Sequence, residues 1–211
     1  MAHDDFAFEP VRGLPEHLPE GERILWQGRP DALALAREAL NLRWVAGYFA
    51  LLALWRFGAM WDQGIGAGLA MAAPFLLLGA LVCGLLWVVA FVQARATVYT
   101  ITTSRVVMRI GAALTLTLNL PFRQIARADL DLRGNGTGTG TGTIALDLVD
   151  HKRLSYLVCW PHVRPWHMRR PQPALRAIPD AARVAALLAE AAEDRVSTPE
   201  LTRAPAALAA E

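Results

Sequence analysis

Lysine is almost absent from this sequence, and arginine carries nearly all of its positive charge. Lys152 is the single lysine among 21 basic residues, and 19 acidic residues reduce the net charge to +2. Such a small charge, spread along the chain instead of gathered in one block, argues against a nucleic-acid-binding protein. We therefore expect no nucleic acid among the partners of this chain.

Cysteine is also scarce, because the chain contains only Cys83, in an apolar stretch, and Cys159, in a polar one. Two cysteines in such different contexts provide neither a disulfide framework nor a zinc site. Residues 1–23 are acidic and proline-rich and lack an apolar segment, so they do not resemble a secretory signal peptide. Any membrane targeting is therefore expected to come from internal segments.

Charge is absent altogether from Gly64 to Val92, a stretch of 29 residues. About 20 apolar residues suffice to cross a hydrocarbon core of about 30 Å. The whole chain is 54% hydrophobic with a mean hydropathy of +0.28, which is high for a soluble domain. We predict a transmembrane helix at 68–92, beginning near Leu69 because Pro74 is tolerated best in a first turn. The alternative is the buried helix of a soluble protein.

A shorter apolar run precedes this segment, from Trp44 to Trp55 between Arg43 and Arg56. The tryptophans lie where an interfacial aromatic belt would place them, and the long arginine side chain can reach outward to the membrane surface. This pattern predicts a first transmembrane helix at 42–61, which would form a hairpin with the second. A re-entrant or interfacial helix is the alternative.

The charges that flank the two apolar segments predict their orientation. The short connection between the segments contains Asp62 and no basic residue, whereas arginines precede the first segment and follow the second. By the positive-inside rule, both termini and most of the polar residues are expected on the cytoplasmic side of a multi-pass protein. Small residues could allow these helices to pack against other helices in the membrane. These residues are Gly64, Gly66, Gly68, Gly79 and Gly84. Formation of a homo-oligomer is therefore one of the expected possibilities.

A different pattern, with a period of two residues, begins directly after the second apolar segment. β-Branched and aromatic residues alternate in VYTITT (98–103), and leucine alternates with threonine and asparagine from Leu114 to Leu120. Such runs, separated by turn residues, are typical of antiparallel hairpins. The expected strands lie at 98–103, 106–110, 112–120, 125–132, 144–150 and 153–160.

The chain then changes to helical spacing after Pro179. Asp180 is a plausible N-cap, and apolar residues follow at Val184, Leu187, Leu188 and Ala191. We expect this helix to pack on the sheet through its apolar side. The alanine- and proline-rich tail at 195–211 is expected to be disordered.

Two of these segments resemble the bacterial PH-like domains of small membrane proteins. The matching residues are LPEGERILWQGRP (18–30) and VYTITTSRVVMRIGAALTLTLNLPFRQIARADL (98–130). The resemblance implies an α+β membrane protein with a cytoplasmic antiparallel β-barrel, or two packed sheets, capped by a C-terminal helix. After an extension at 1–17, the first strand would lie at 18–30, the helical hairpin would follow, and 96–194 would form the main part of the domain.

A more specific resemblance adds CWPHVRPWHMRRPQPALRAIPDAARVA (159–185) to the opening FEPVRGLPEHLPEGERILWQGRPD (8–31). With these segments the chain is similar to the PuhB family of photosynthetic complex assembly proteins of purple bacteria. The resemblance implies a non-enzymatic assembly factor for the photosynthetic reaction centre, with an influence on the core light-harvesting antenna. The expected partners are reaction-centre subunits, and the expected location is the bacterial inner (intracytoplasmic) membrane.

The sequence contains few candidates for catalytic, metal-binding or cofactor-binding residues. GNGTGTGTGT (134–143) lacks the lysine of a phosphate-binding loop, and its flanks alternate like strands, so we interpret it as a hairpin connection. His162 and His167 match no familiar zinc spacing and are expected to be structural or exposed. Asp129 and Asp131 are expected to face water. With no catalytic triad, carboxylate pair or Cys/His dyad in view, we expect no enzyme and no cofactor.

The densest basic and aromatic cluster comprises Arg164, Trp166, Arg169 and Arg170. Arginine and tryptophan are over-represented in protein interface hot spots and also suit anionic lipid headgroups. We predict that this cluster contacts a partner protein. Two alternatives stay open, namely a solvated loop whose tryptophan packs under the domain, and a PH-like membrane adaptor that binds lipid without a photosynthetic partner.

Overall fold

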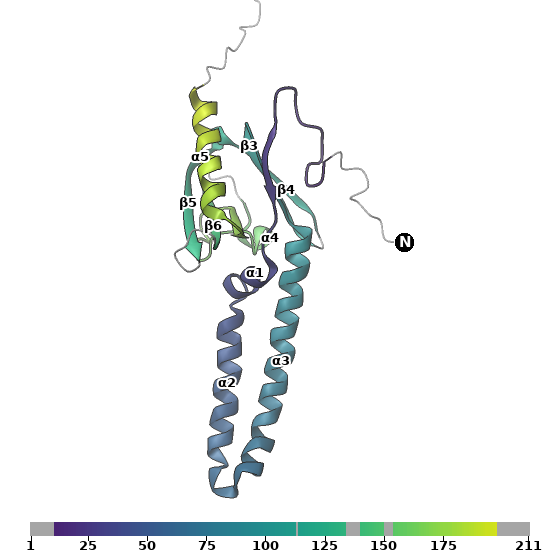
Figure 1. The fold of residues 1–211 in the computed structure, drawn as a ribbon, viewed down its shortest axis with the longest axis vertical. Coiled ribbons are helices and arrows are strands. Elements are labelled where there is room, and N and C mark those ends of the chain that lie inside the picture. The colour runs from purple at the N-terminus through teal and green to yellow at the C-terminus, as the bar shows by residue number, and fades with distance from the viewer. Residues whose placement is uncertain (1–10, 113, 134–139, 150–153, 198–211) are drawn as a thin grey trace, which may run out of the picture.

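The computed structural model describes residues 11–112, 114–133, 140–149 and 154–197. Two long helices extend from one end of a domain that is built from two β-sheets and a C-terminal helix (Figure 1). In chain order the elements are β1 (Ile24–Gly28), α1 (Ala32–Glu38), α2 (Leu42–Ala59), η1 (Trp61–Gln63), α3 (Ile65–Ala96), β2 (Val98–Thr102), β3 (Arg105–Ile110), β4 (Leu116–Pro121), η2 (Phe122–Gln124), β5 (Ile125–Arg133), β6 (Thr141–Leu148), α4 (Tyr156–Cys159), β7 (Ala174–Ile178) and α5 (Ala181–Ser197).

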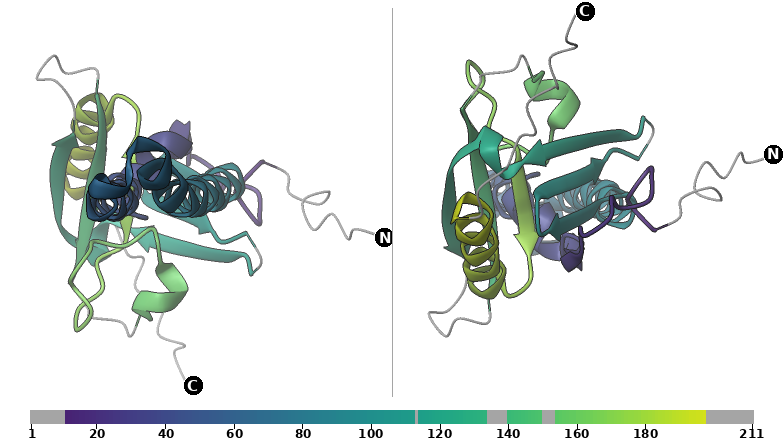
Figure 2. Two further views of the ribbon diagram at one scale, coloured as in Figure 1. Left: turned by 90° about the horizontal axis from the view of Figure 1, so that it is seen from below. Right: turned by 90° about the horizontal axis from the view of Figure 1, so that it is seen from above.

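The strands form two separate antiparallel sheets, in the orders β1-β2-β3-β4 and β5-β6-β7. The end-on views show these sheets as two layers with α5 beside the second (Figure 2). The described residues therefore adopt the form with two packed sheets, and they do not close into a barrel. Strand β1, at the edge of the first sheet, is separated in sequence from its neighbour β2 by the two long helices.

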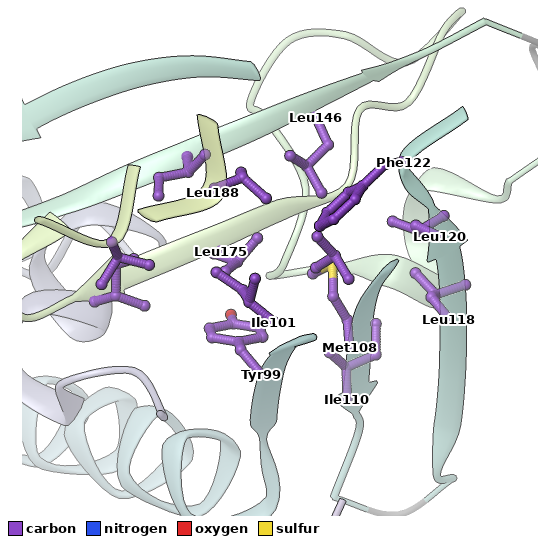
Figure 3. Packing of buried hydrophobic residues seen from close by; sticks show 14 of the residues in the cluster. Tyr99, Ile101, Met108, Ile110, Leu118, Leu120, Phe122, Leu146, Leu175 and Leu188 are labelled. Atoms are coloured by element: carbon purple, nitrogen blue, oxygen red, sulfur yellow. The ribbon is translucent and has the colours of Figure 1, made fainter. Parts of the chain in front are cut away.

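The core lies between the two sheets and is closed by α5. Tyr99 and Met108 from the first sheet meet Leu146 and Leu175 from the second, and all four side chains are fully buried (Figure 3). Leu188 joins them from α5, as its helical spacing predicted. Alternate side chains of β2 and β3, such as Tyr99 and Met108, therefore point into this core. Strand β7 is buried along its whole length.

The strand predictions were wrong in one segment and incomplete in another. Residues 153–160 do not form a strand, because the described part contains helix α4 (Tyr156–Cys159), on which Leu157 is 83% exposed. A short apolar run does not distinguish a strand from a helix by periodicity. Strand β6 pairs with β5 on one side and with β7 (Ala174–Ile178) on the other. The sequence analysis identified neither β7 nor α1.

Helix α3 is the single helix, within the described residues, that is long and apolar enough to cross a membrane. It spans Ile65–Ala96, with a mean hydropathy of 2.8 in its most apolar window. The helix begins at Ile65, before the span predicted at 68–92, and Pro74 lies inside it and not in its first turn. The first predicted span at 42–61 is not supported as a separate crossing. Helix α2 has 18 residues, and Arg43 and Arg56 near its two ends lower its hydropathy.

Two glycines of α3 allow α2 to pack closely along it. A Cβ atom at Gly68 would lie 2.9 Å from the Phe57 ring, and one at Gly79 would lie 2.7 Å from Cβ of Phe49. At Gly84 a Cβ atom would meet nothing within 4 Å. Of the glycines predicted to make helix contacts, Gly68 and Gly79 therefore lie against α2 of the same chain.

The predicted boundary between the C-terminal helix and the tail differs slightly from the structure. Helix α5 continues to Ser197, so the segment predicted as a disordered tail begins inside the helix, and its remainder at 198–211 lies outside the described residues. Most of the glycine-rich run also lies outside them, while Thr141–Leu148 forms β6.

Candidate partner-contact site

The predicted contact cluster lies on an excursion of the chain between α4 and β7. Backbone hydrogen bonds join Ala174 N to His162 O at 2.9 Å and Arg164 N to Gln172 O at 2.9 Å, and Val163 forms a β-bridge with Pro173. These bonds hold the two arms together, so residues 165–171 form the turn between them. We refer to residues 165–171 as the tip loop.

The tip loop exposes three of the four predicted residues. Trp166 is 87% exposed and has a φ of 66°, which is uncommon for a residue with a side chain. Met168 is 63% exposed, and Arg169 and Arg170 are exposed with no ion-pair partner among the described residues. His167 is also exposed, and its Nδ1 lies 2.9 Å from Pro165 O. Trp166 therefore does not pack under the domain, whereas a solvated loop remains an alternative to a partner contact.

Arg164, the fourth predicted residue, has a structural contact instead. Its Nη1 donates to Asp129 Oδ2 at 2.8 Å and to Gln172 Oε1 at 3.1 Å. Asp129 lies on β5 and also accepts from Arg127. Burial opposes ionisation of Asp129, but these arginine contacts prevail and hold its pKa below the usual value. Asp129 therefore ties the base of the tip loop to the second sheet, whereas Asp131 pairs with the exposed Arg133.

Beneath the tip loop, His162 is completely buried in a hydrogen-bonded chain. Tyr99 Oη lies 2.6 Å from His162 Nδ1, and Thr97 Oγ1 lies 3.0 Å from His162 Nε2. Tyr99 Oη accepts from the backbone N of Arg176, and Thr97 Oγ1 donates to Gln93 O. Tyr99 therefore donates to Nδ1, and the histidine proton resides on Nε2. Burial and the nearby Arg176 lower the His162 pKa to about 3, so the ring is neutral.

Arg176 extends this buried junction toward α1. Its guanidinium donates to the carbonyl oxygens of Pro161 at 3.4 Å and of Glu38 at 3.1 Å, and the residue is only 4% exposed. Burial lowers the pKa of Arg176 and raises that of Glu38. Because Thr97 follows α3 directly and Glu38 ends α1, this junction fixes the domain to the helices that lead away from it.

The two segments that carry the family resemblance meet in space. Glu22 accepts from Arg105 Nε at 2.8 Å and Nη2 at 2.7 Å, and from Thr102 Oγ1 at 2.6 Å. Burial opposes ionisation of Glu22, but the hydrogen bonds from Arg105 and Thr102 hold its pKa below the usual value. The glutamate of the first segment and the Thr-x-x-Arg of the second therefore form a structural clamp between β1 and the β2–β3 turn.

The described residues contain no group of three or more His, Cys, Asp or Glu side chains that could hold a metal ion. Cys159 is buried, and burial raises the pKa of its thiol. The arrangement offers an anchored and exposed tryptophan with two arginines, which suits recognition of another surface.

Comparison with known proteins agrees with the two-sheet domain. The chain matches the bacterial PH domain family over residues 42–192, from the start of α2 into α5. A Rhodobacter capsulatus protein, described as an uncharacterized 23.7 kDa protein in the puhA 5' region, is 49% identical over 212 residues, which cover 100% of this chain and 98% of that protein. No solved structure matches. The chain therefore belongs to the bacterial PH domain family.

Proposed function

We propose that the chain is a membrane-anchored assembly factor for the photosynthetic reaction centre, acting by docking and not by catalysis. The observation that carries this proposal is the tip loop, which presents Trp166 at 87% exposure on a base held by the Arg164–Asp129 pair. An amphipathic aromatic side chain that is exposed and locally anchored is suited to enter a pocket on a partner.

The photosynthetic context comes from one relative. The Rhodobacter capsulatus protein is encoded in the 5' region of puhA, which suggests a photosynthesis-related setting for a chain that is 49% identical to it. The PuhB-like segment WPHVRPWHMRRPQP (160–173) includes the whole tip loop. The segment on which the PuhB-like resemblance depends is thus the one with the exposed aromatic and basic side chains.

The membrane anchor in this proposal is the pair α2 and α3. Helix α3 carries large exposed apolar side chains along its length, among them Leu69, Leu77 and Leu85, at 58 to 72% exposure. Helix α2 packs along α3 and exposes Leu51 and Leu54, at 65 and 67%. Apolar side chains on all outer faces of a helix pair favour burial in lipid. Strand β1 before α2 pairs with strand β2 after α3, so the chain leaves the domain through α2 and returns through α3. If α3 crosses the bilayer, α2 would therefore cross it as well, and both termini would face the cytoplasm.

The domain would stand at the cytoplasmic membrane face, where newly inserted reaction-centre subunits emerge. Confinement to the same membrane raises the encounter rate of the two partners without any additional contact. An influence on the core antenna would be indirect. The alternative adaptor role, in which Arg169 and Arg170 bind anionic headgroups and no protein, makes the opposite prediction for crosslinking from the tip loop.

A deletion of the gene tests the function directly. We expect lower reaction-centre content with normal pigment synthesis, and normal reaction-centre levels in the deletion strain would reject the proposal. A photo-crosslinker placed at Trp166 in the full-length protein tests the site. Recovery of reaction-centre subunits supports docking, whereas recovery of lipid alone supports the adaptor.

A further inference from the structure

A cavity of about 640 Å³ lies where α3 enters the domain, and no residue of the tip loop is among the described residues that line it. Among the described residues, its charged lining consists of Arg12, Arg95 and Arg109. Its apolar lining includes Phe91 and Val92, which belong to the last turns of α3. The cavity therefore combines a basic part with an apolar part at the end of the proposed membrane helix.

Each arginine is brought to the cavity by a separate element. Arg109 lies on β3, lines the cavity and is only 3% exposed. Arg95 lies in the last turn of α3, and its guanidinium carbon is 5.6 Å from the centre of the Phe91 ring. A cation held over an aromatic ring is oriented by that contact.

Arg12 comes from the segment that precedes β1, and its position depends on a close backbone approach. Gly13, with a φ of 85°, lies so near β2 that a Cβ atom would be 2.6 Å from Cγ1 of Val98. In addition, Gln27 Nε2 donates to Arg12 O at 2.8 Å. The backbone of this segment is therefore fixed against the first sheet, and Arg12 is placed at the cavity by the fold.

We propose that this cavity binds the phosphodiester headgroup of an anionic phospholipid from the cytoplasmic leaflet. Arginine is well matched to phosphate oxygens, and three arginines from three elements can surround one such group. Phe91 and Val92 would lie beside the acyl chains, since they face the same cavity from the membrane side. The inference depends on the proposed insertion of α3 into the bilayer, and it adds a lipid site that neither docking by the tip loop nor family membership requires.

The experiment uses the full-length protein in detergent with an equimolar mixture of phosphatidylglycerol and phosphatidylcholine, and native mass spectrometry counts the retained lipids. We expect preferential retention of phosphatidylglycerol. Arg12→Gln and Arg95→Gln should each reduce the preference about fivefold, since a basic residue near an anionic surface contributes about that factor. These two side chains are exposed, so the variants are expected to fold. Arg43→Gln, at the exposed start of α2 and outside the cavity, is the matched control and should keep the preference.

Other outcomes overturn the inference. Equal retention of the two lipids, or an equal loss in Arg43→Gln, would show that no headgroup site exists. A second arm adds soluble glycerol phosphate, and binding of that compound as tight as binding of the lipid would identify a free phosphate ester as the ligand. An alkaline carbonate wash of native membranes separates the two proposals. A chain that stays in the membrane without lipid preference refutes only the cavity, whereas a chain that is released refutes the membrane anchor itself.

Discussion

Tyr99 Oη donates a hydrogen bond to Nδ1 of His162 at 2.6 Å, and both residues are fully buried. Tyr99 lies on β2, directly after α3, whereas His162 precedes the tip loop. This bond therefore joins the end of the helix pair to the base of the candidate partner-contact site. The rings also meet edge to face, with 5.8 Å between their centres.

Tyr99→Phe tests this junction. The substitution leaves His162 Nδ1 and the Arg176 N–H without their hydrogen-bond partner in the interior, which should lower the free energy of unfolding by about 1–3 kcal/mol. Thermal unfolding of the full-length protein in detergent, followed by circular dichroism, measures the loss. Tyr48→Phe is the matched control, because Tyr48 is 58% exposed on α2 and should show no change. Equal stability of the two variants would contradict the assigned network.

The same histidine predicts a pH dependence. Burial keeps the folded pKa of His162 at about 3, whereas an unfolded histidine has a pKa of about 6.5. Between these values the unfolded chain binds a proton that the folded chain does not, so stability is full above pH 6.5 and falls with decreasing pH. The expected slope from this residue is roughly 1 kcal/mol per pH unit.

Unfolding measured from pH 7.5 to pH 4.5 checks this slope. His162→Gln should be less stable at neutral pH but should lose stability more slowly on acidification. His167→Gln should retain the wild-type slope, because His167 is exposed. A slope that is unchanged in His162→Gln would show that other groups cause the pH dependence.

The Glu22–Arg105 clamp provides a third prediction. Glu22 has a side chain only 6% exposed, and Glu22→Gln removes the charge that Arg105 and Thr102 stabilise. We expect a loss of about 2 kcal/mol, as for other hydrogen bonds to charged groups. Asp131→Asn is the control, since the Asp131–Arg133 pair is exposed and should contribute less than about 1 kcal/mol. Because the folded Glu22 pKa is lowered, its contribution is present above the unfolded value and is lost as the pH falls through the folded value.

Helix pairing in the proposed anchor can be tested at the glycines of α3. Gly79→Val places methyl groups where Phe49 of α2 already lies, so the helices must separate, at a cost of about 1–3 kcal/mol. Gly84→Val is the matched control, because a Cβ atom there meets nothing within 4 Å. The thermal midpoint in detergent should fall for Gly79→Val only. If Gly84→Val causes the same fall, the packing of α2 against α3 does not explain the effect.

The sequence predicted the β2–β3 hairpin of the first sheet well because its signal is local. In β2 and β3 the β-branched and aromatic residues and the turn at Ser104 indicate a hairpin, and the structure pairs Tyr99 with Met108 as such a hairpin requires. The helix after Pro179 was also predicted, from the helical spacing of Val184 and Leu188. These elements need no information from distant parts of the chain.

The second sheet and the site depended on contacts that no local pattern contains. Strand β7 has the sequence ALRAI, and its complete burial comes from β6 on one side and α1 on another. Arg164 has the residue type expected at an interface, but its partner Asp129 lies 35 positions earlier in the sequence. From its residue type, Arg164 was predicted to contact a partner together with the exposed residues of the tip loop. Its structural contact with Asp129 becomes evident only from the fold.

The last prediction concerns the tip loop itself. Trp166→Ala removes the most exposed large side chain of the proposed contact and, because the ring contacts little of its own domain, the thermal midpoint should stay the same. Loss of an interface tryptophan typically costs 2 kcal/mol or more, so crosslinking to the partner from a photo-crosslinker placed at Met168 should fall about 30-fold. Leu114→Ala, which truncates a side chain that is 87% exposed beyond the end of β3, is the matched control and should preserve crosslinking. A wild-type yield in Trp166→Ala would place the partner contact elsewhere on the domain, while a parallel loss in Leu114→Ala would indicate a general effect of reduced surface hydrophobicity.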